Sequence, residues 1–300
     1  MKVTILGNNS ALPAFGRHPS AQVVNVYGEI LLIDCGEGTQ VQMQRYGLKW
    51  RNMQHIFISH LHGDHYFGLP GLINSMSLLG RIAPLHLYAP KELESMLNQI
   101  LDVADTKLSY PLHFHPLPDG PDVLVDNELF SVSCFPVDHR IFCQGFLVVR
   151  KTKGRRLLPD KCREYEIPAY FYDRLKKGED YERQDGVIVK NELVTTDGPS
   201  IKRYAYSADT VFTDSYIPFI QGVDALYHEC TYLENDAEKA RSRFHCTAKQ
   251  AAQIAKMANA KQLLLGHFSS KYRDLEPFKE EASEIFPNVL VTIEGVAYEI

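Results

Sequence analysis

The sequence predicts an α/β (α+β) protein that carries a metal site at the ends of its strands, and three observations indicate this. Short apolar runs typical of buried strands alternate with segments of helical periodicity along the chain. Residues able to bind a metal directly follow several of these runs. With 300 residues, 45% hydrophobic and 23% charged, the chain can bury a core large enough to hold a rigid site.

Composition and charge exclude several classes of protein. The net charge of −5 argues against a chain that binds nucleic acid over its whole surface, although it is compatible with a local basic patch. The first residues alternate like a strand instead of forming a signal peptide, and no run approaches the length of a membrane span. The six cysteines form no CxxC pair, which favours buried free thiols over disulfides or a thiolate zinc site. We therefore expect a cytoplasmic protein without membrane contact.

The expected elements are short and closely spaced. A loop rich in Gly, Pro, Asn and Ser covers 7–19, and a tight turn at 27–28 joins two strands. The helix at 72–79 has so few polar residues that it is either core or a subunit contact. Thr247 is a plausible N-cap for a helix at 248–258. Strands are predicted at 2–6, 21–26, 29–33, 52–59, 85–88, 112–116, 128–136, 145–149 and 200–207, and further helices at 40–46 and 92–103.

Metal-binding side chains are most dense at 60–65, where His-Leu-His-Gly-Asp-His follows an apolar strand. Three imidazoles and a carboxylate this close would compete for partners unless a cation organised them, because polar groups without partners are costly to bury. The alternative is a polar surface turn. We favour a metal site.

Single polar residues follow other apolar strands in the same way. Asp34 either caps the next helix or accepts a hydrogen bond from a metal-binding imidazole. His139 alone would more often be structural, but its position after a strand repeats the pattern. Asp209 can bridge two cations if it lies beside the first cluster. The pattern returns at 228–229 and at His267.

The composition changes at Arg150. Seven basic residues and one acid fall within 150–163, and aromatic and basic residues continue to Gly178. Such a segment in an acidic protein is what a phosphate backbone would bind. The alternative, a solvated and disordered insertion, is the commoner explanation for such a stretch taken alone.

Together these residues resemble the metallo-β-lactamase superfamily. The HxHxDH signature of that superfamily matches 60–65, and its later His, Asp and His ligands match three of the single residues above. The resemblance implies a four-layer αββα sandwich with a two-metal site along one sheet edge. The implied ligands are His60, His62, Asp64, His65, His139, Asp209 and His267.

Within the superfamily the chain is most similar to the ribonuclease Z family, endonucleases that trim the 3′ trailer from precursor tRNA. The similarity covers nearly the whole chain and implies the same activity, with a tRNA 3′-hydroxyl and a 5′-phosphorylated trailer as products. The basic segment lies where the family carries a protruding arm, so we expect one domain, 1–300, with a tRNA-binding arm inserted at about 150–195. The similar segments are 34–40, 63–71, 206–210, 228–231 and 245–247.

Two segments depart from the family pattern. The first loop often reads Pro-x-Lys-x-Arg-Asn, but Phe15 and His18 stand here at the lysine and asparagine positions. The arm usually carries Gly-Pro before Tyr-Gly-Lys-Leu, and this chain has Tyr170 and Phe171 in that region. The departure in the first loop bears on where the RNA is cut. The departure in the arm bears on the shape of its tip.

The resemblance also implies the metals and their ligands. Imidazole and carboxylate ligands suit two zinc ions per subunit, although manganese, iron and cobalt accept the same donors. Asp209 would bridge the two ions. The other implied ligands divide into His60, His62 and His139 for one ion and Asp64, His65 and His267 for the other.

Three residues would move protons in this scheme. Asp64 would take the proton from the attacking water, and His245 would protonate the leaving 3′ oxygen while Glu229 orients its imidazole. The alternative for His245 is a surface histidine at a helix N-terminus. The competing functions are another hydrolase of the same fold that acts on small phosphodiesters or related esters, and an RNA-binding or metal-sensing module without catalysis. The apolar helix and the resemblance both suggest a homodimer.

Overall fold

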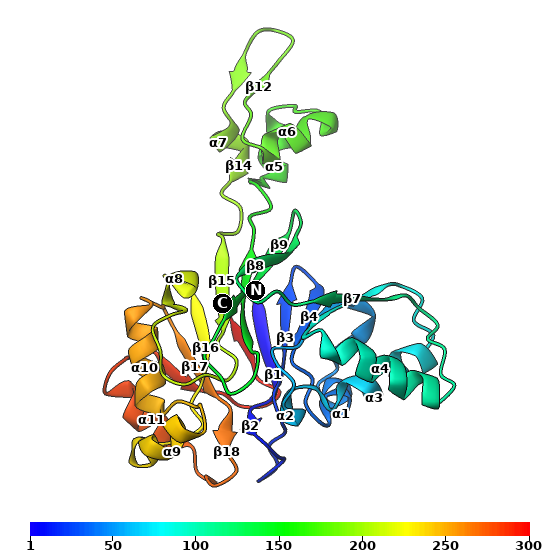
Figure 1. The fold of residues 1–300 in the computed structure, drawn as a ribbon. Coiled ribbons are helices and arrows are strands. Elements are labelled where there is room, and N and C mark those ends of the chain that lie inside the picture. Colours follow the sequence, from blue (N-terminus) through cyan, green and yellow to red (C-terminus); the bar gives the residue numbers. More distant parts are fainter.

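Two seven-stranded sheets pack face to face, and helices cover the outer face of each (Figure 1). The computed structural model describes residues 1–300. The two ends of the chain meet in the first sheet, where β1 pairs with β20. This is the four-layer αββα sandwich that the resemblance to the metallo-β-lactamase superfamily implied.

The first sheet has the strand order β20-β1-β3-β4-β5-β6-β7. Its β1, β3 and β4 are antiparallel, whereas β4 to β7 run parallel. The strands are β1 (Lys2–Gly7), β3 (Ala21–Val26), β4 (Glu29–Ile33), β5 (Met53–Phe57), β6 (Leu85–Ala89), β7 (Leu112–Pro116) and β20 (Ala297–Glu299).

The second sheet has the order β19-β17-β16-β15-β10-β9-β8. Strands β15, β16, β17 and β19 are parallel, and the others are antiparallel. The strands are β8 (Asp122–Asp126), β9 (Phe130–Pro136), β10 (Gln144–Arg150), β15 (Lys202–Tyr206), β16 (Ala225–Glu229), β17 (Leu263–Gly266) and β19 (Val289–Val291), and a separate short pair joins β2 (Asn9–Ser10) to β18 (Phe268–Ser269).

Helices pack on the outer faces of the sheets because this contact buries their apolar sides. Thr247 begins α10 with the expected cap, here a full capping box with Gln250. The helices beside the first sheet are α1 (Thr39–Arg45), α2 (Gly63–Tyr66), α3 (Leu69–Leu78) and α4 (Glu92–Val103), with the 3₁₀ turn η1 (Trp50–Asn52). Those beside the second are α8 (Ile217–Ile220), α9 (Ala237–Ser242), α10 (Ala248–Met257) and α11 (Glu276–Ser283), with η3 (Glu234–Asp236).

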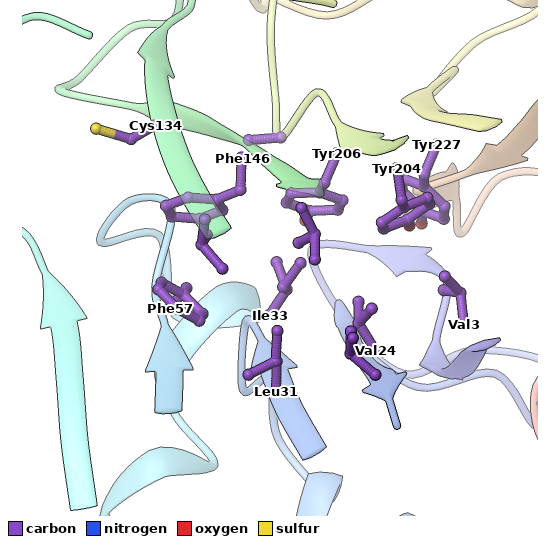
Figure 2. Packing of buried hydrophobic residues seen from close by; sticks show 14 of the residues in the cluster. Val3, Val24, Leu31, Ile33, Phe57, Cys134, Phe146, Tyr204, Tyr206 and Tyr227 are labelled. Carbon is purple, nitrogen blue, oxygen red and sulfur yellow. The ribbon is translucent and has the colours of Figure 1, made fainter. Parts of the chain in front are cut away.

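The core has three apolar layers, one between the sheets and one under each helical face. In β4, Leu31 and Ile33 belong to the central layer and Ile30 and Leu32 to the outer one. Such a strand reads as a continuous apolar run because both of its faces are buried. Figure 2 shows the central layer, with Val3, Val24, Leu31, Ile33 and Phe57 of the first sheet opposite Phe146, Tyr204, Tyr206 and Tyr227 of the second.

The chain between β10 and β15 leaves the sandwich and extends away from it (Figure 1, green, top). We call residues 151–199 the projection. Seven buried residues give it a small core of its own, which includes Phe171 and Leu175. Its elements are β11 (Arg156–Leu157), α5 (Pro159–Glu164), η2 (Ala169–Phe171), α6 (Tyr172–Lys176), β12 (Tyr181–Glu182), β13 (Ile188–Val189), α7 (Asn191–Val194) and β14 (Thr195–Thr196).

The elements that were predicted are present in the structure, with shifts at some ends. The predicted helix at 72–79 is α3, which begins at Leu69 because Pro70 fits the first helical turn. Strands β8, β19 and β20 and helices α9 and α11 were not predicted. All six cysteines are buried free thiols, as expected. No helix combines the length and apolarity needed to cross a membrane.

Candidate metal centre

The first donor group joins the loop after β5 to the loops after β9 and β15. The Nδ1 atom of His62 lies 3.1 Å from Nε2 of His60 and 3.1 Å from Nε2 of His139. Asp209 Oδ2 lies 3.6 Å from His60 Nε2 and 4.0 Å from His139 Nε2. Residues from three distant positions of the sequence therefore converge on one point, as the metal hypothesis requires.

The second donor group lies beside the first. Asp64 Oδ2 is 3.7 Å from His65 Nε2 and 3.4 Å from His267 Nε2, and the two imidazole nitrogens are 3.3 Å apart. Asp209 also faces this group, with Oδ2 3.4 Å from His65 and Oδ1 3.3 Å from His267. Asp209 thus contacts both groups, the position expected of a bridging ligand.

The donors fit divalent metal ions. Ligand atoms around a tetrahedral zinc ion lie about 3.3 Å apart, because the bonds measure about 2.0–2.1 Å. The spacings above are close to this value. Asp209 Oδ1 is buried and accepts no hydrogen bond, so it has a free lone pair at the centre of the cluster. Nitrogen and oxygen donors without thiolate suit zinc, and also manganese, iron or cobalt.

Outer hydrogen bonds fix the direction of three of the imidazoles. His65 Nδ1–H donates to Asp34 Oδ2 at 2.7 Å, and His139 Nδ1–H donates to the Phe244 carbonyl at 3.0 Å. His267 Nδ1 is 2.9 Å from Thr231 Oγ1. With the proton on Nδ1, each Nε2 keeps its lone pair for the cluster, which is the usual arrangement of metal-binding histidines.

Asp34 resolves the alternative that the sequence left open. Its side chain also accepts hydrogen bonds from Ser59 N and Oγ and from the Tyr206 hydroxyl, at 2.5 to 2.9 Å. The helix that follows has Gly38 at its N-cap and no side-chain cap. Asp34 therefore supports the His65 imidazole and does not cap α1.

The carboxylates of the cluster stay ionised although they are buried. Burial alone would raise the pKa of Asp64 and Asp209, but the imidazoles of His65 and His267 hold both values well below the ordinary range. Burial lowers the pKa of His60, and lowers that of His62 to about 4. Two ionised carboxylates beside His60 and His62, whose low pKa values keep them neutral at pH 7, form a donor set suited to metal ions.

The backbone is strained where the strands deliver these groups. Asp34, Ala208 and His267 have φ values of 56°, 54° and 60°, and they follow β4, β15 and β17. Non-glycine residues rarely adopt this left-handed conformation, and it tends to persist at functional sites where the surroundings enforce it. At each of these three residues the backbone turns sharply toward the cluster.

Glu229 and His245 form a pair beside the cluster. His245 Nδ1 lies 3.1 Å from Glu229 Oε1, which also accepts the Cys246 N–H at 2.9 Å. Glu229 outweighs the effect of burial and raises the pKa of His245 to about 8. A ring nitrogen of His245 lies within 4.8 Å of ligand atoms of Asp209 and His267. The imidazole therefore stands protonated at neutral pH next to the donors.

A cleft of about 750 Å³ opens over this arrangement. Leu12 of the first loop and Ser269 lie on its walls, together with residues of both donor groups. The Ala11 N–H donates to Asp64 Oδ2 at 2.7 Å, which brings the first loop against the second donor group. A molecule bound in this cleft can contact both the donor groups and His245.

Known proteins are similar in sequence to this chain over its full length. Ribonuclease Z from Parabacteroides distasonis is 42% identical over 299 residues, which cover 99% of this chain and 98% of that protein. The chain belongs to the ribonuclease Z family. It is therefore a metal-dependent endoribonuclease of the ribonuclease Z type.

Solved structures agree with this assignment. The crystal structure of human tRNase Z, short form, is 28% identical, covers 100% of this chain and 99% of its own, and superimposes with a TM-score of 0.74. The metallo-β-lactamase fold protein YhfI from Bacillus subtilis is 20% identical, covers 99% of both chains and has a TM-score of 0.70, which shows the shared fold. Residues 1–117 also match a family model described as anti-Pycsar protein Apyc1, which covers less than half of the chain.

The altered first loop keeps a firm anchor despite its departure from the ribonuclease Z pattern. Arg17 donates to Asn9 Oδ1 at 2.9 Å and to the Tyr272 carbonyl at 2.5 Å. His18 binds Glu294 through its backbone N–H and lies 2.8 Å from it through Nδ1. Phe15 at the tip is 54% exposed. The substitutions therefore leave the base of the loop fixed and change its exposed tip.

Several supporting residues were not recognised in the sequence. Ser59, Tyr206 and Thr231 hold Asp34 or a metal-facing imidazole through their hydroxyl groups. Each stands close in sequence to a predicted site residue, but a hydroxyl has no distinctive spacing. Arg140 also reaches the cluster, with Nη2 3.2 Å from His62 Nε2. Its position directly after His139 was the available signal.

Proposed function

We propose that this ribonuclease Z-type chain removes the 3′ trailer from precursor tRNA by hydrolysing one phosphodiester bond, leaving a tRNA 3′-hydroxyl and a 5′-phosphorylated trailer. The observation that carries the proposal is the pair of donor groups joined by Asp209, beside the Glu229–His245 pair, in a chain of this family. Initial rates on end-labelled precursor tRNA and on cyclic nucleotides test it. Faster turnover of cyclic nucleotides would contradict it.

We propose two zinc ions per subunit as the cofactors, held by the two donor groups with Asp209 between them. Manganese, iron or cobalt remain chemically suitable for the same donors. When bound, such ions neutralise the phosphate and lower the pKa of bound water. Metal analysis of the purified protein measures both the number and the element.

The remaining steps use the protein's own side chains. Asp64, whose carboxylate is held ionised, lies in the cleft and accepts the proton of the attacking water. His245 carries its proton at neutral pH and donates it to the leaving 3′ oxygen. Glu229 acts through His245, because its carboxylate fixes the ring at Nδ1 and keeps the imidazole charged.

We propose that the projection is a tRNA-binding arm inserted into the single sandwich domain. Residues 151–199 contain eleven basic and ten acidic side chains, so the arm is less basic as a whole than its first part. Most of its cations are paired, as in Arg155–Asp197 and Lys161–Glu164. Lys153, Arg156 and Lys177 have no acidic partner, and a polar groove of about 800 Å³ at the arm base contains two of them, Lys153 and Lys177. These free charges are suited to an RNA backbone.

Removing the free cations is expected to weaken tRNA binding through charge alone. In Lys153→Gln/Lys177→Gln, the slope of log Kd against log salt for precursor tRNA is expected to fall by about 1 to 2, because fewer counterions are released. Lys161→Gln is the matched control, since that lysine already pairs with Glu164. An unchanged slope in the double variant would show that the base of the arm does not bind the tRNA backbone.

We propose a homodimer formed through the exposed end of α3. Leu78, Leu79 and Ile82 are 80%, 69% and 81% exposed, and hollows of about 840 and 520 Å³ beside them contain Trp50. Apolar side chains gathered in this way usually meet a partner. A second copy fits a symmetric assembly, in which the arm of one subunit can present tRNA to the cleft of the other.

Charged substitutions are expected to separate the subunits. Leu78→Glu/Leu79→Glu should elute as a 34.1 kDa monomer in gel filtration with light scattering, while the unaltered protein gives twice that mass. Val103→Glu changes an equally exposed residue at the end of α4 and should stay dimeric. A monomeric unaltered protein would refute the dimer. We also propose a cytoplasmic location, which six buried free thiols support.

A further inference from the structure

An aromatic ring stands exposed at the mouth of the metal cleft. Phe67 follows α2, lines the cleft together with His62 and Asp64, and is 62% exposed. Large apolar side chains are usually buried, and the metal chemistry described above makes no use of this one. Its position next to the reacting centre calls for a ligand with an apolar face.

The ring is held in place by its neighbours. A Cβ atom at Gly63 would lie 2.2 Å from Phe67 Cε2, so the ring rests directly against the backbone of the metal-binding loop. It also packs edge-on against the buried ring of Tyr66, with centroids 4.9 Å apart. Gly63 is therefore required by the Phe67 ring, and the ring meets a ligand with little loss of conformational freedom.

Two cations share the cleft with this ring. Arg140 and Arg243 both line it, both are exposed, and neither forms an ion pair with an acidic side chain. Guanidinium groups bind phosphate oxygens through several N–H donors. An aromatic platform that shares a cleft with two arginines matches the alternating base and phosphate of a single RNA strand.

We propose that Phe67 stacks on the base of a nucleotide directly adjacent to the scissile phosphate, and that Arg140 and Arg243 bind the phosphates that flank it. The inference deepens the proposed function and depends on it. Stacking on an aromatic side chain tolerates any base, because every base offers a π-face. Phe67 thus positions the strand over the metal ligands without requiring a particular sequence.

The test combines ring variants with abasic substrates. Phe67→Leu keeps an apolar side chain over Gly63 and is expected to lower kcat/KM for precursor tRNA roughly 5- to 100-fold, whereas Phe67→Trp keeps the stacking face and most of the activity. Two further precursors lack the base on the 5′ or on the 3′ side of the cut. The loss caused by Phe67→Leu should disappear on one of these two substrates, because the ring then has nothing to stack on.

Three other results would overturn the inference. An unchanged kcat/KM for Phe67→Leu on the complete precursor would show that the ring has no role. An equal loss on all three precursors would show that it only supports the metal loop. A monomeric Phe67→Leu in light scattering, with a matching loss on every substrate, would place the ring in the subunit contact. Cleavage of the complete precursor by the unaltered protein tests the proposed function separately.

Discussion

Replacing His245 by alanine is expected to lower kcat/KM for precursor tRNA by a factor of roughly 10² to 10⁴, which is the usual contribution of a general acid. The metal content should stay unchanged, because the seven donors that converge on the cluster do not require this residue. Single-turnover cleavage and metal analysis of the same preparation measure both. If the variant cleaves normally, His245 is not the proton donor.

The pH profile distinguishes proton donation from a structural role. His245 must be protonated to act, so activity should fall as pH rises through its pKa of about 8. Glu229 raises this pKa, and Glu229→Gln should therefore move the alkaline limb of the profile to lower pH. An alkaline limb at the same pH in Glu229→Gln would contradict the assignment of Glu229 as the residue that keeps the imidazole charged.

Asp209→Asn is expected to have the second large effect. Its carboxylate faces both donor groups and carries the only buried oxygen among the donors without a hydrogen-bond partner. The amide supplies neither the charge nor the second anionic oxygen, so metal content should fall below two ions per subunit. We expect kcat/KM to fall by at least about 10³-fold, because the charge stabilisation and water activation of a two-metal site are lost together.

Two control variants calibrate this result. Asp34→Asn alters a residue that contacts His65 from outside the cluster, and such supporting residues usually contribute only 10- to 100-fold to metal affinity. Asp224→Asn alters a carboxylate paired with Lys261 at the far end of β16 and should leave metal content and cleavage unchanged. If Asp209→Asn retains two ions and normal activity, Asp209 does not bridge.

The proposed metal ligands could be recognised in the sequence because most of them stand in one short motif. Residues 60–65 carry their signal locally, whereas His139, Asp209 and His267 were noted for their positions after apolar strands and took their role from the family resemblance. Parallel strands meet at the same sheet edge, so residues at their carboxyl ends come together. The role of Asp34 could not be decided in this way, since it depends on the contact of β4 with β5 and with Tyr206 of the other sheet.

The projection was harder to predict for two physical reasons. Its core consists of only seven residues from several very short elements, including Cys162 and Val194, and so produces no helical or strand periodicity. Its ion pairs join distant residues, such as Arg155 and Asp197, which a count of local charges cannot reveal. The exposed ring of Phe67 was also missed, because exposure is a property of the fold and not of the motif around it.

We expect cleavage of precursor tRNA to depend on metal ions held by the seven donor side chains. The most direct test is digestion of end-labelled precursor tRNA by protein stripped of metal with a chelator, before and after zinc is restored. We expect no cleavage by the stripped protein, and after about two zinc ions per subunit a single cut that leaves a tRNA 3′-hydroxyl. Undiminished cleavage by the metal-free protein would contradict the account.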